Sequence, residues 1–140
     1  KMDFKVYDYL SESAKFVRQT VFVEEQGFVN ELDETDNIAT HIVLYDEKKP
    51  AAACRIFAGE KSGEFILGRL AVMKDYRGKN VGSMVLAEAE KCVLAKGGKI
   101  LMLHSQCRAK DFYAKSGYTE FGEIGYDEGC PHIWMKKQLG

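Results

Sequence analysis

Residues 77–84, with the sequence RGKNVGSM, have the types and spacing needed to bind an anion. Gly78 and Gly82 keep side chains away from the backbone, and Arg77 and Lys79 supply positive charge. An apolar, strand-like run precedes this segment and an apolar-striped helical pattern follows it. The first N–H groups of a helix lack intrahelical partners and lie at the positive end of its dipole, so they favour a phosphate. The segment therefore predicts a site for a ligand that carries a diphosphate.

The spacing excludes two familiar phosphate-binding motifs. A P-loop requires GxxxxGK followed by Ser or Thr, whereas only three residues separate Gly78 from Gly82 and Ser83 follows directly. The dinucleotide fingerprint GxGxxG is also absent. A purely structural interpretation stays open, in which the glycines shape a strand-to-helix turn and Asn80 or Ser83 caps the helix.

An acid-rich segment, EEQGFVNELDETD at residues 24–36, permits two interpretations. Most such runs are solvated surface loops, and the lack of a clean period predicts a partly helical loop on the surface. Alternatively, the carboxylates form the mouth of a site that attracts an amine, with Phe22, Phe28 and Val29 as an apolar wall beside them.

The hydrophobic pattern predicts the elements that must position these groups. A helix capped by Ser11 should follow the first strand and fade near Gly27, and a second helix should run from the 77–84 segment to the glycines at 97–98. A short helix is expected at 106–115. Strands are expected at 3–8, 41–45, 51–57, 65–73, 99–104, 118–121 and 131–137. This order implies an antiparallel meander followed by a parallel pair with a crossover helix.

Composition limits the class of protein. The chain has 140 residues, which suits one domain over 1–140; 46% are hydrophobic, 29% are charged, and the net charge is −1. The lack of a basic excess argues against nucleic acid as a partner. No apolar run has transmembrane length and no signal-peptide core is present, so a cytoplasmic location without a membrane partner is expected. The four cysteines are scattered and predict no metal site; Cys107 could carry an acyl group, but a reduced, inert thiol is favoured.

Three stretches resemble the GNAT superfamily of N-acetyltransferases. Residues 77–82 are similar to its acetyl-CoA motif, R/Q-x-x-G-x-G/A, with Asn80 where the family usually has Gly. QCRAKDFYAKSGY is similar to N-x-x-A-x-x-L/F-Y-x-x-x-G-F/Y, with Gln106 at the Asn position and Tyr113 at the Tyr position. VFVEEQGFVNELDETD resembles the ElaA-like branch, and the matching residues are Glu25, Gln26, Glu31, Asp33, Asp36 and His41.

The resemblance implies an α/β acyl-CoA N-acyltransferase fold, with about seven strands in a mixed, partly antiparallel sheet and helices on both faces. It implies transfer of an acetyl group from acetyl-CoA to the primary amine of a small molecule, by direct attack in a ternary complex and without a metal. The residues that it assigns to donor binding are Leu70, Ala71, Val72, Arg77, Gly78, Lys79, Asn80, Val81, Gly82, Ser83, Met84 and Gln106.

The same resemblance assigns catalytic roles. Tyr113 is expected to be the general acid, because a phenol with a pKa near 10 is protonated at neutral pH. Glu25 is the first candidate for the general base and His41 the second, although His41 equally suits a satisfied histidine at a strand start.

The acceptor side is less defined by sequence. Glu31 and Asp33 are expected to bind the acceptor amine. Arg69 would either anchor an anionic part of the acceptor or pair with an acid of the 24–36 segment.

Two other functions remain open at the level of sequence. The protein could be a non-catalytic sensor that binds acyl-CoA or CoA, and turnover would separate this from an enzyme. A nucleotide-binding interaction domain would need neither Tyr113 nor the acidic segment. The acceptor amine is not specified by the sequence, and a homodimer is an option because exposed edge strands often pair.

Overall fold

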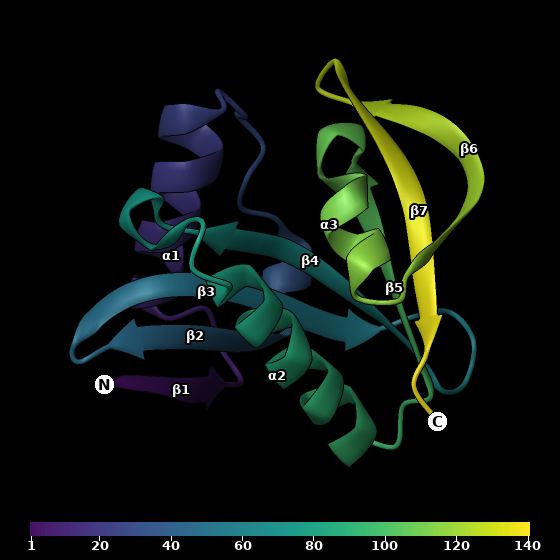
Figure 1. The fold of residues 1–140 in the computed structure, drawn as a ribbon, viewed down its shortest axis with the longest axis horizontal. Coiled ribbons are helices and arrows are strands. Elements are labelled where there is room, and N and C mark those ends of the chain that lie inside the picture. Colours follow the sequence, from purple (N-terminus) through teal and green to yellow (C-terminus); the bar gives the residue numbers. More distant parts are fainter.

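A seven-stranded mixed sheet forms the centre of the computed structural model, which describes residues 1–140 (Figure 1). Its strand order is β1-β2-β3-β4-β5-β7-β6, and only β4 and β5 are parallel. The strands are β1 (Met2–Tyr7), β2 (Thr40–Asp46), β3 (Lys49–Ala58), β4 (Glu64–Val72), β5 (Ile100–Gln106), β6 (Thr119–Asp127) and β7 (Cys130–Gln138). The predicted fold class is confirmed.

The helices agree with the sequence pattern. They are α1 (Glu12–Arg18), a π-helical continuation η1 (Gln19–Glu25), α2 (Val81–Ala95) and α3 (Lys110–Lys115), with 3-10 turns η2 (Glu34–Asn37), η3 (Lys74–Tyr76) and η4 (Cys107–Ala109). Ser11 caps α1 as predicted, because the Ala14 N–H donates to its Oγ at 3.2 Å. None of these helices has the length and apolar character needed to cross a membrane.

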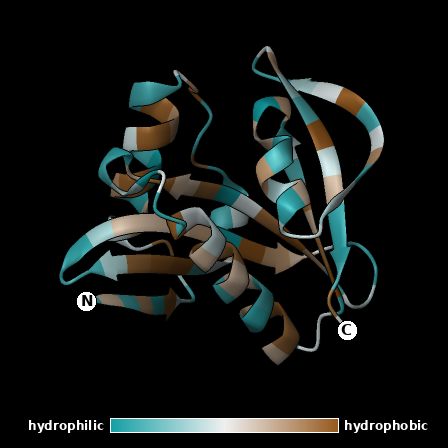
Figure 2. Cartoon of the chain, in the orientation of Figure 1, coloured by the Kyte–Doolittle hydropathy of each residue, from teal (hydrophilic) through white to brown (hydrophobic).

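Hydrophobic side chains bury both faces of the sheet. On one face Ile42 and Leu44 pack with α2, and on the other Val43 packs with α1 and the start of η1, because successive strand residues point in opposite directions. In Figure 2 the brown, hydrophobic positions gather along the middle of β2, β3 and β4, while the turn between β2 and β3 is teal. Helices therefore cover both faces, as predicted.

The sheet splits where β4 leaves β5. Their parallel pairing runs only from Glu64 opposite Ile100 to Leu67 opposite Leu103. Immediately afterwards the β3–β4 register shifts, and Arg69 adopts a positive φ of 53°, which marks a β-bulge. Beyond it β4 diverges from β5 (Figure 1), so residues 68–72 have no strand partner on their β5 side.

The acid-rich segment corrects one expectation. A surface loop was predicted for residues 24–36, but Glu31 and Asp36 are each only 5% exposed. Burial is tolerated because Arg18 and Arg55, both buried, pair with these carboxylates. The prediction of β6 was also too short, since this strand continues past an irregularity between Phe121 and Gly125.

Candidate active site

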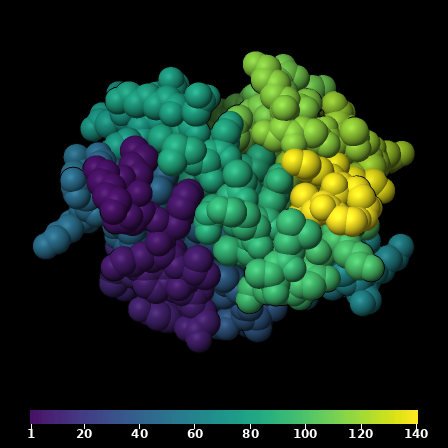
Figure 3. Space-filling view, turned by 60° about the horizontal axis from the view of Figure 1, so that its bottom comes forward, coloured from purple at the N-terminus to yellow at the C-terminus, as the bar shows by residue number.

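A groove follows the turn between β4 and α2. Gly78 and Asn80 have φ values of 75° and 62°, so the turn keeps its left-handed conformation with Asn in the usual Gly position. Figure 3 shows a notch at the top of this face, between teal atoms near residues 70–80 and yellow-green atoms near 110–120. The groove is lined by Leu70, Val72, Tyr76, Arg77, Gly78, Asn80, Val81, Gly82, Ser83, Ala109, Phe112, Tyr113 and Lys115.

Gly82 allows α2 to approach α3 closely. A Cβ at this position would lie 3.1 Å from Cζ of Phe112 and 3.7 Å from Cγ2 of Val72. A side chain at residue 82 would therefore press against Phe112, which lines the groove. The first N–H groups of α2 form one wall of it and have no intrahelical acceptor.

Arg77 links the turn to β4 and to η1. Its Nε donates to the Val72 carbonyl at 2.9 Å, and its Nη2 lies 2.6 Å from the Glu25 carboxylate. Glu25, expected as the general base, is thus an ion-pair partner of Arg77 and borders a separate surface hollow beside Phe16 and Met73. The structure does not bring Glu25 together with Tyr113.

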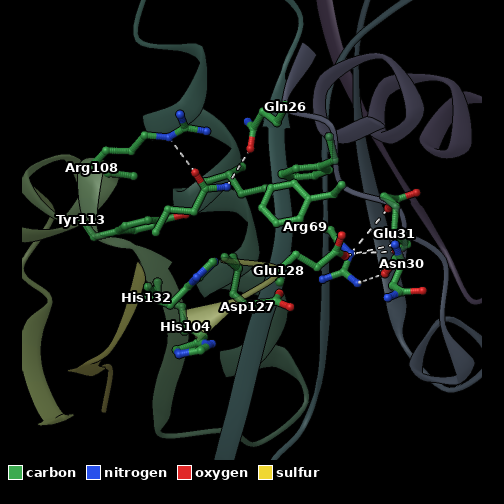
Figure 4. A pocket seen from close by; sticks show the side chains of 18 residues that line it. Gln26, Asn30, Glu31, Arg69, His104, Arg108, Tyr113, Asp127, Glu128 and His132 are labelled. Carbon is green, nitrogen blue, oxygen red and sulfur yellow. Dashed lines mark hydrogen bonds and ion pairs between the residues drawn. The ribbon is translucent and has the colours of Figure 1, made fainter. Parts of the chain in front are cut away.

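A second cavity, of about 260 Å³, lies on the other side of the split in the sheet (Figure 4). The π-helical turn η1 and the residues after it contribute Phe22, Gln26 and Phe28, and Gln26 Oε1 accepts a hydrogen bond from Gln106 Nε2 at 2.8 Å. The remaining lining residues are Asn30, Glu31, Leu67, Gly68, Arg69, Leu70, Leu103, His104, Gln106, Arg108, Ala109, Tyr113, Asp127, Glu128 and His132.

The groove and the cavity meet at three shared residues, Leu70, Ala109 and Tyr113. Tyr113 is only 8% exposed, and burial, together with the neighbouring Cys54 thiol, raises the pKa of its phenol above the ordinary value. The phenol is therefore protonated at neutral pH, and it lies at the junction of the two spaces. Cys107 lines neither space.

The residues expected to bind the donor divide into two groups. Eight of them line the groove: Leu70, Val72, Arg77, Gly78, Asn80, Val81, Gly82 and Ser83. Ala71 is buried against α1, Lys79 and Met84 lie outside the lining, and Gln106 faces the cavity on the other side of the split.

The acid-rich segment is held by alternating charges. Arg18 pairs with Glu31 and with Asp36 at 2.7 Å, and Arg55 pairs with Asp33 at 2.6 Å and Asp36 at 2.8 Å. Burial alone would raise the pKa of Asp36, but hydrogen bonds from Arg18, from the Asp33 N–H and from Arg55 hold this pKa well below its ordinary value. The hydrogen bond from Arg55 likewise lowers the pKa of Asp33.

This network also settles the positions of Arg69 and His41. Arg69 donates to the Glu31 carbonyl at 2.9 Å and lies 3.3 Å from the Asp33 carboxylate, so it pairs with the acid-rich segment while lining the cavity. His41 is 1% exposed, and its Nε2 is hydrogen-bonded to the Asp36 carbonyl at 3.0 Å. It is therefore a buried histidine with a hydrogen-bond partner at the start of a strand. Asp33 and His41 do not line the cavity, whereas Glu31 does.

Six polar residues of the cavity were not singled out by the sequence analysis: Asn30, His104, Arg108, Asp127, Glu128 and His132. The β6–β7 turn carries Glu128 across the cavity mouth, where its carboxylate accepts the N–H groups of Val29 at 2.9 Å and Asn30 at 3.1 Å. The hairpin signal in YDEGC and the alternation around His132 indicate strands. Their approach to the cavity depends on the register of three strands, which the local pattern does not contain.

Comparisons with known proteins agree with this geometry. A family model described as "Acetyltransferase (GNAT) domain" matches residues 7–139. The chain belongs to the GNAT acetyltransferase family. The resemblance predicted from the three motifs is therefore confirmed, and GNAT membership identifies the protein as an acetyltransferase.

Individual GNAT relatives cover nearly the whole chain. YjcF of Bacillus subtilis, named an uncharacterized N-acetyltransferase, is 36% identical over 129 residues, which are 90% of this chain and 91% of YjcF. The crystal structure of Escherichia coli ElaA superposes with a TM-score of 0.83 at 26% identity and covers 99% of this chain and 100% of ElaA.

A more distant GNAT-fold structure contains a ligand. This aminoglycoside 6'-N-acetyltransferase, described as complexed with coenzyme A, has a TM-score of 0.78 at 15% identity, with 98% of this chain and 97% of that chain covered. At this identity the similarity concerns the fold alone. No group of three or more His, Cys, Asp or Glu side chains in the present chain is arranged to hold a metal ion.

Proposed function

We propose that this GNAT protein transfers an acetyl group from acetyl-CoA to the primary amine of a small molecule, by direct attack in a ternary complex. One observation carries the proposal: the groove beside α2 and the cavity beneath the β6–β7 hairpin meet at Leu70, Ala109 and Tyr113. A donor in the groove and an acceptor in the cavity would each reach the same point from opposite sides of the split sheet.

The groove suits acetyl-CoA. The unpartnered N–H groups at the start of α2 would bind the pyrophosphate, and Lys115 adds positive charge at the rim. The pantetheine arm would run along residues 70–72, where β4 has separated from β5 and can hydrogen-bond like an added strand. A backbone N–H near Val72 would then stabilise the negative charge that develops on the thioester oxygen as the acyl carbon becomes tetrahedral.

The cavity suits a small cationic acceptor. Among its acids, Glu31 pairs with arginines and Glu128 accepts two backbone N–H groups, whereas Asp127 has neither an ion-pair nor a hydrogen-bond partner. Asp127 would bind the ammonium group of the acceptor, and Phe22 and Phe28, whose rings meet edge to face at 6.5 Å, would cover its apolar part.

In the transfer step the neutral amine attacks the thioester carbon, the C–N bond forms, and the C–S bond breaks as the tetrahedral intermediate collapses. Tyr113 would give its phenol proton to the departing thiolate. General acid catalysis of this kind contributes about 10²- to 10⁴-fold to a rate. Proximity of two bound substrates supplies a further part of the acceleration.

The test combines calorimetry with turnover. We expect acetyl-CoA to bind more tightly than ADP, and an amine panel to give thiol release with acetylated product. Tyr113→Phe should lower kcat about 100-fold or more while leaving the Kd of acetyl-CoA within about twofold. Gly82→Trp should abolish donor binding by filling the groove, whereas Met84→Ala, outside it, should not.

Three outcomes would contradict the proposal. Absence of acetyl-CoA binding in a folded sample would refute the donor site. Tight binding without thiol release would indicate the sensor function instead. An unaltered kcat in Tyr113→Phe would remove Tyr113 from the mechanism.

A further inference from the structure

His132, in β7, is a buried histidine that faces the acceptor cavity. It is 6% exposed, and the strand register sets it opposite Gln106 of β5 and Gly125 of β6. A Cβ added to Gly125 would meet nothing within 4 Å, so no side chain from β6 covers the imidazole at that register position. Figure 4 places His132 beside Asp127 and His104 on one wall of the cavity.

The hydrogen bonding of His132 fixes its tautomer. Nδ1 lies 2.8 Å from the carbonyl oxygen of Cys130, and a carbonyl can only accept, so Nδ1 carries the proton. In the neutral ring Nε2 then holds a lone pair. No group of the chain is hydrogen-bonded to Nε2. Nε2 also keeps some exposure, because Arg55 Nε is the only side-chain N or O atom that is both fully buried and without a hydrogen-bond partner. Nε2 is therefore an unprotonated nitrogen without a partner in the chain, on a side chain that lines the cavity.

The neighbouring imidazole of His104 does not compete with His132 for this role. The His104 ring stacks on Trp134 with centroids 4.9 Å apart, and its centroid lies 4.8 Å from that of the tilted His132 ring. This partial burial and the neighbouring imidazole lower the pKa of His104, so His104 stays neutral and does not compete for the charge. Besides Tyr113, the charged or titratable groups that face the cavity with His132 are Glu31, Arg69, His104, Arg108, Asp127 and Glu128.

Most of these groups are already engaged. Glu31 and Arg69 pair with each other within the arginine network, Glu128 accepts the N–H groups of Val29 and Asn30, and Arg108 donates to Gln106 at 2.7 Å. Asp127 is the free carboxylate, on the same face of the β6–β7 pair as His132, two residues beyond Gly125. Its negative charge would stabilise an imidazolium as well as an ammonium.

We propose that Nε2 of His132 is the general base that takes a proton from the acceptor ammonium. The assignment rests on the proposed function. It replaces Glu25 and His41, because neither of them reaches this cavity. The protons of the reaction balance. Of the three protons on the acceptor ammonium, one stays on the amide nitrogen and one leaves through His132 to solvent. The third is balanced by the proton that the CoA thiol gains.

The pH dependence of kcat/KM tests this role. In the wild type, kcat/KM should level off at a pH well below the amine pKa near 10, because His132 takes the proton from the ammonium. His132→Gln should be about 100-fold slower at pH 7, and its rate should keep rising toward the amine pKa near 10, because it needs an amine that is already neutral. A deficit that is the same at every pH would mean a structural role and overturn the proposal.

Two further variants sharpen the test. Imidazole added to His132→Ala should restore activity in proportion to its concentration, and failure to do so, with the Kd of acetyl-CoA unchanged, would count against a base. Lys136→Gln removes a titratable group from the same strand outside the cavity and should keep the wild-type profile. If the wild type itself acetylates no amine, the proposed function fails; if it does and His132→Gln matches its profile, only the base assignment fails.

A spectroscopic readout does not depend on turnover. Long-range ¹H–¹⁵N spectra of the free protein at pH 8, assigned by the signals lost in His132→Gln, should show His132 neutral with its proton on Nδ1. A proton on Nε2 would leave no lone pair facing the cavity and would overturn the proposal.

Discussion

Asp36 is the carboxylate on which the acid-rich segment depends. It is 5% exposed and receives hydrogen bonds from Arg18 and Arg55, while its own carbonyl binds His41. Removing one partner of a buried charge network typically costs about 3–5 kcal/mol, because the remaining charges stay buried and uncompensated. We therefore expect Asp36→Asn to lower the free energy of unfolding by about that amount at pH 7, measured by urea denaturation.

The pH dependence of this loss follows from the lowered pKa of Asp36. A carboxylate whose pKa is lower in the folded state stabilises the fold above its unfolded pKa, and this contribution disappears as the pH falls through the folded value. The difference between wild type and Asp36→Asn should thus be constant above about pH 5 and shrink below about pH 4. Glu34→Gln, an exposed acid of the same turn, serves as control and should change stability by less than about 0.5 kcal/mol. An Asp36→Asn protein as stable as the control would refute the role.

At the scale of elements, the turn between β4 and α2 depends on Asn80 at φ 62°. Left-handed backbone costs an ordinary L-residue about 1–2 kcal/mol, more for a β-branched one, whereas Asn and Gly tolerate it. Asn80→Val should therefore distort the first turn of α2 and weaken acetyl-CoA binding about tenfold or more, measured by calorimetry. Asn80→Gly should bind within about threefold of wild type. Equal affinities for Val and Gly would mean that the turn does not set the donor site.

The elements also explain which parts of the site were predictable. Arg77–Ser83 and Tyr113 lie in local motifs, one a strand–turn–helix and one within a single helix, so the family resemblance could single them out as candidates. The role of Glu31 was different, because its partner Arg18 lies 13 residues away on another element. From sequence alone, a carboxylate that pairs with a buried guanidinium cannot be distinguished from one that is exposed to water.

His132 and Asp127 needed still more information. His132 lies in a strand that the sequence predicted, whereas Asp127 lies in the part of β6 beyond the predicted residues 118–121. Both reach the cavity only because β7 inserts between β5 and β6. The order of strands in a sheet is a property of the whole chain. The fold class was therefore predictable from the order of elements, while one wall of the acceptor cavity was not.

At the scale of the whole molecule, the sheet consists of two parts joined by a short seam. Strands β1–β4 with α1 form one part, and β5–β7 with α3 form the other. They share four β4–β5 register pairs, the crossover helix α2, and two links across the cavity, Gln26 to Gln106 and Glu128 to residues 29–30. A donor in the groove would touch both parts, since Val72 and Phe112 line it from opposite sides.

Acetyl-CoA should consequently stabilise both parts together. At 100 times its Kd, a ligand that binds only the folded state adds about 2.7 kcal/mol, which for a chain of this length raises Tm by roughly 8 °C. Hydrogen exchange should slow in residues 68–72 of β4 and also in α3, because the ligand closes the split between them. ADP, which lacks the pantetheine arm, should protect only the start of α2. If acetyl-CoA protected only residues 77–84, the donor would bind the turn without contacting both parts of the sheet. That result would contradict the proposal that donor and acceptor meet at Tyr113.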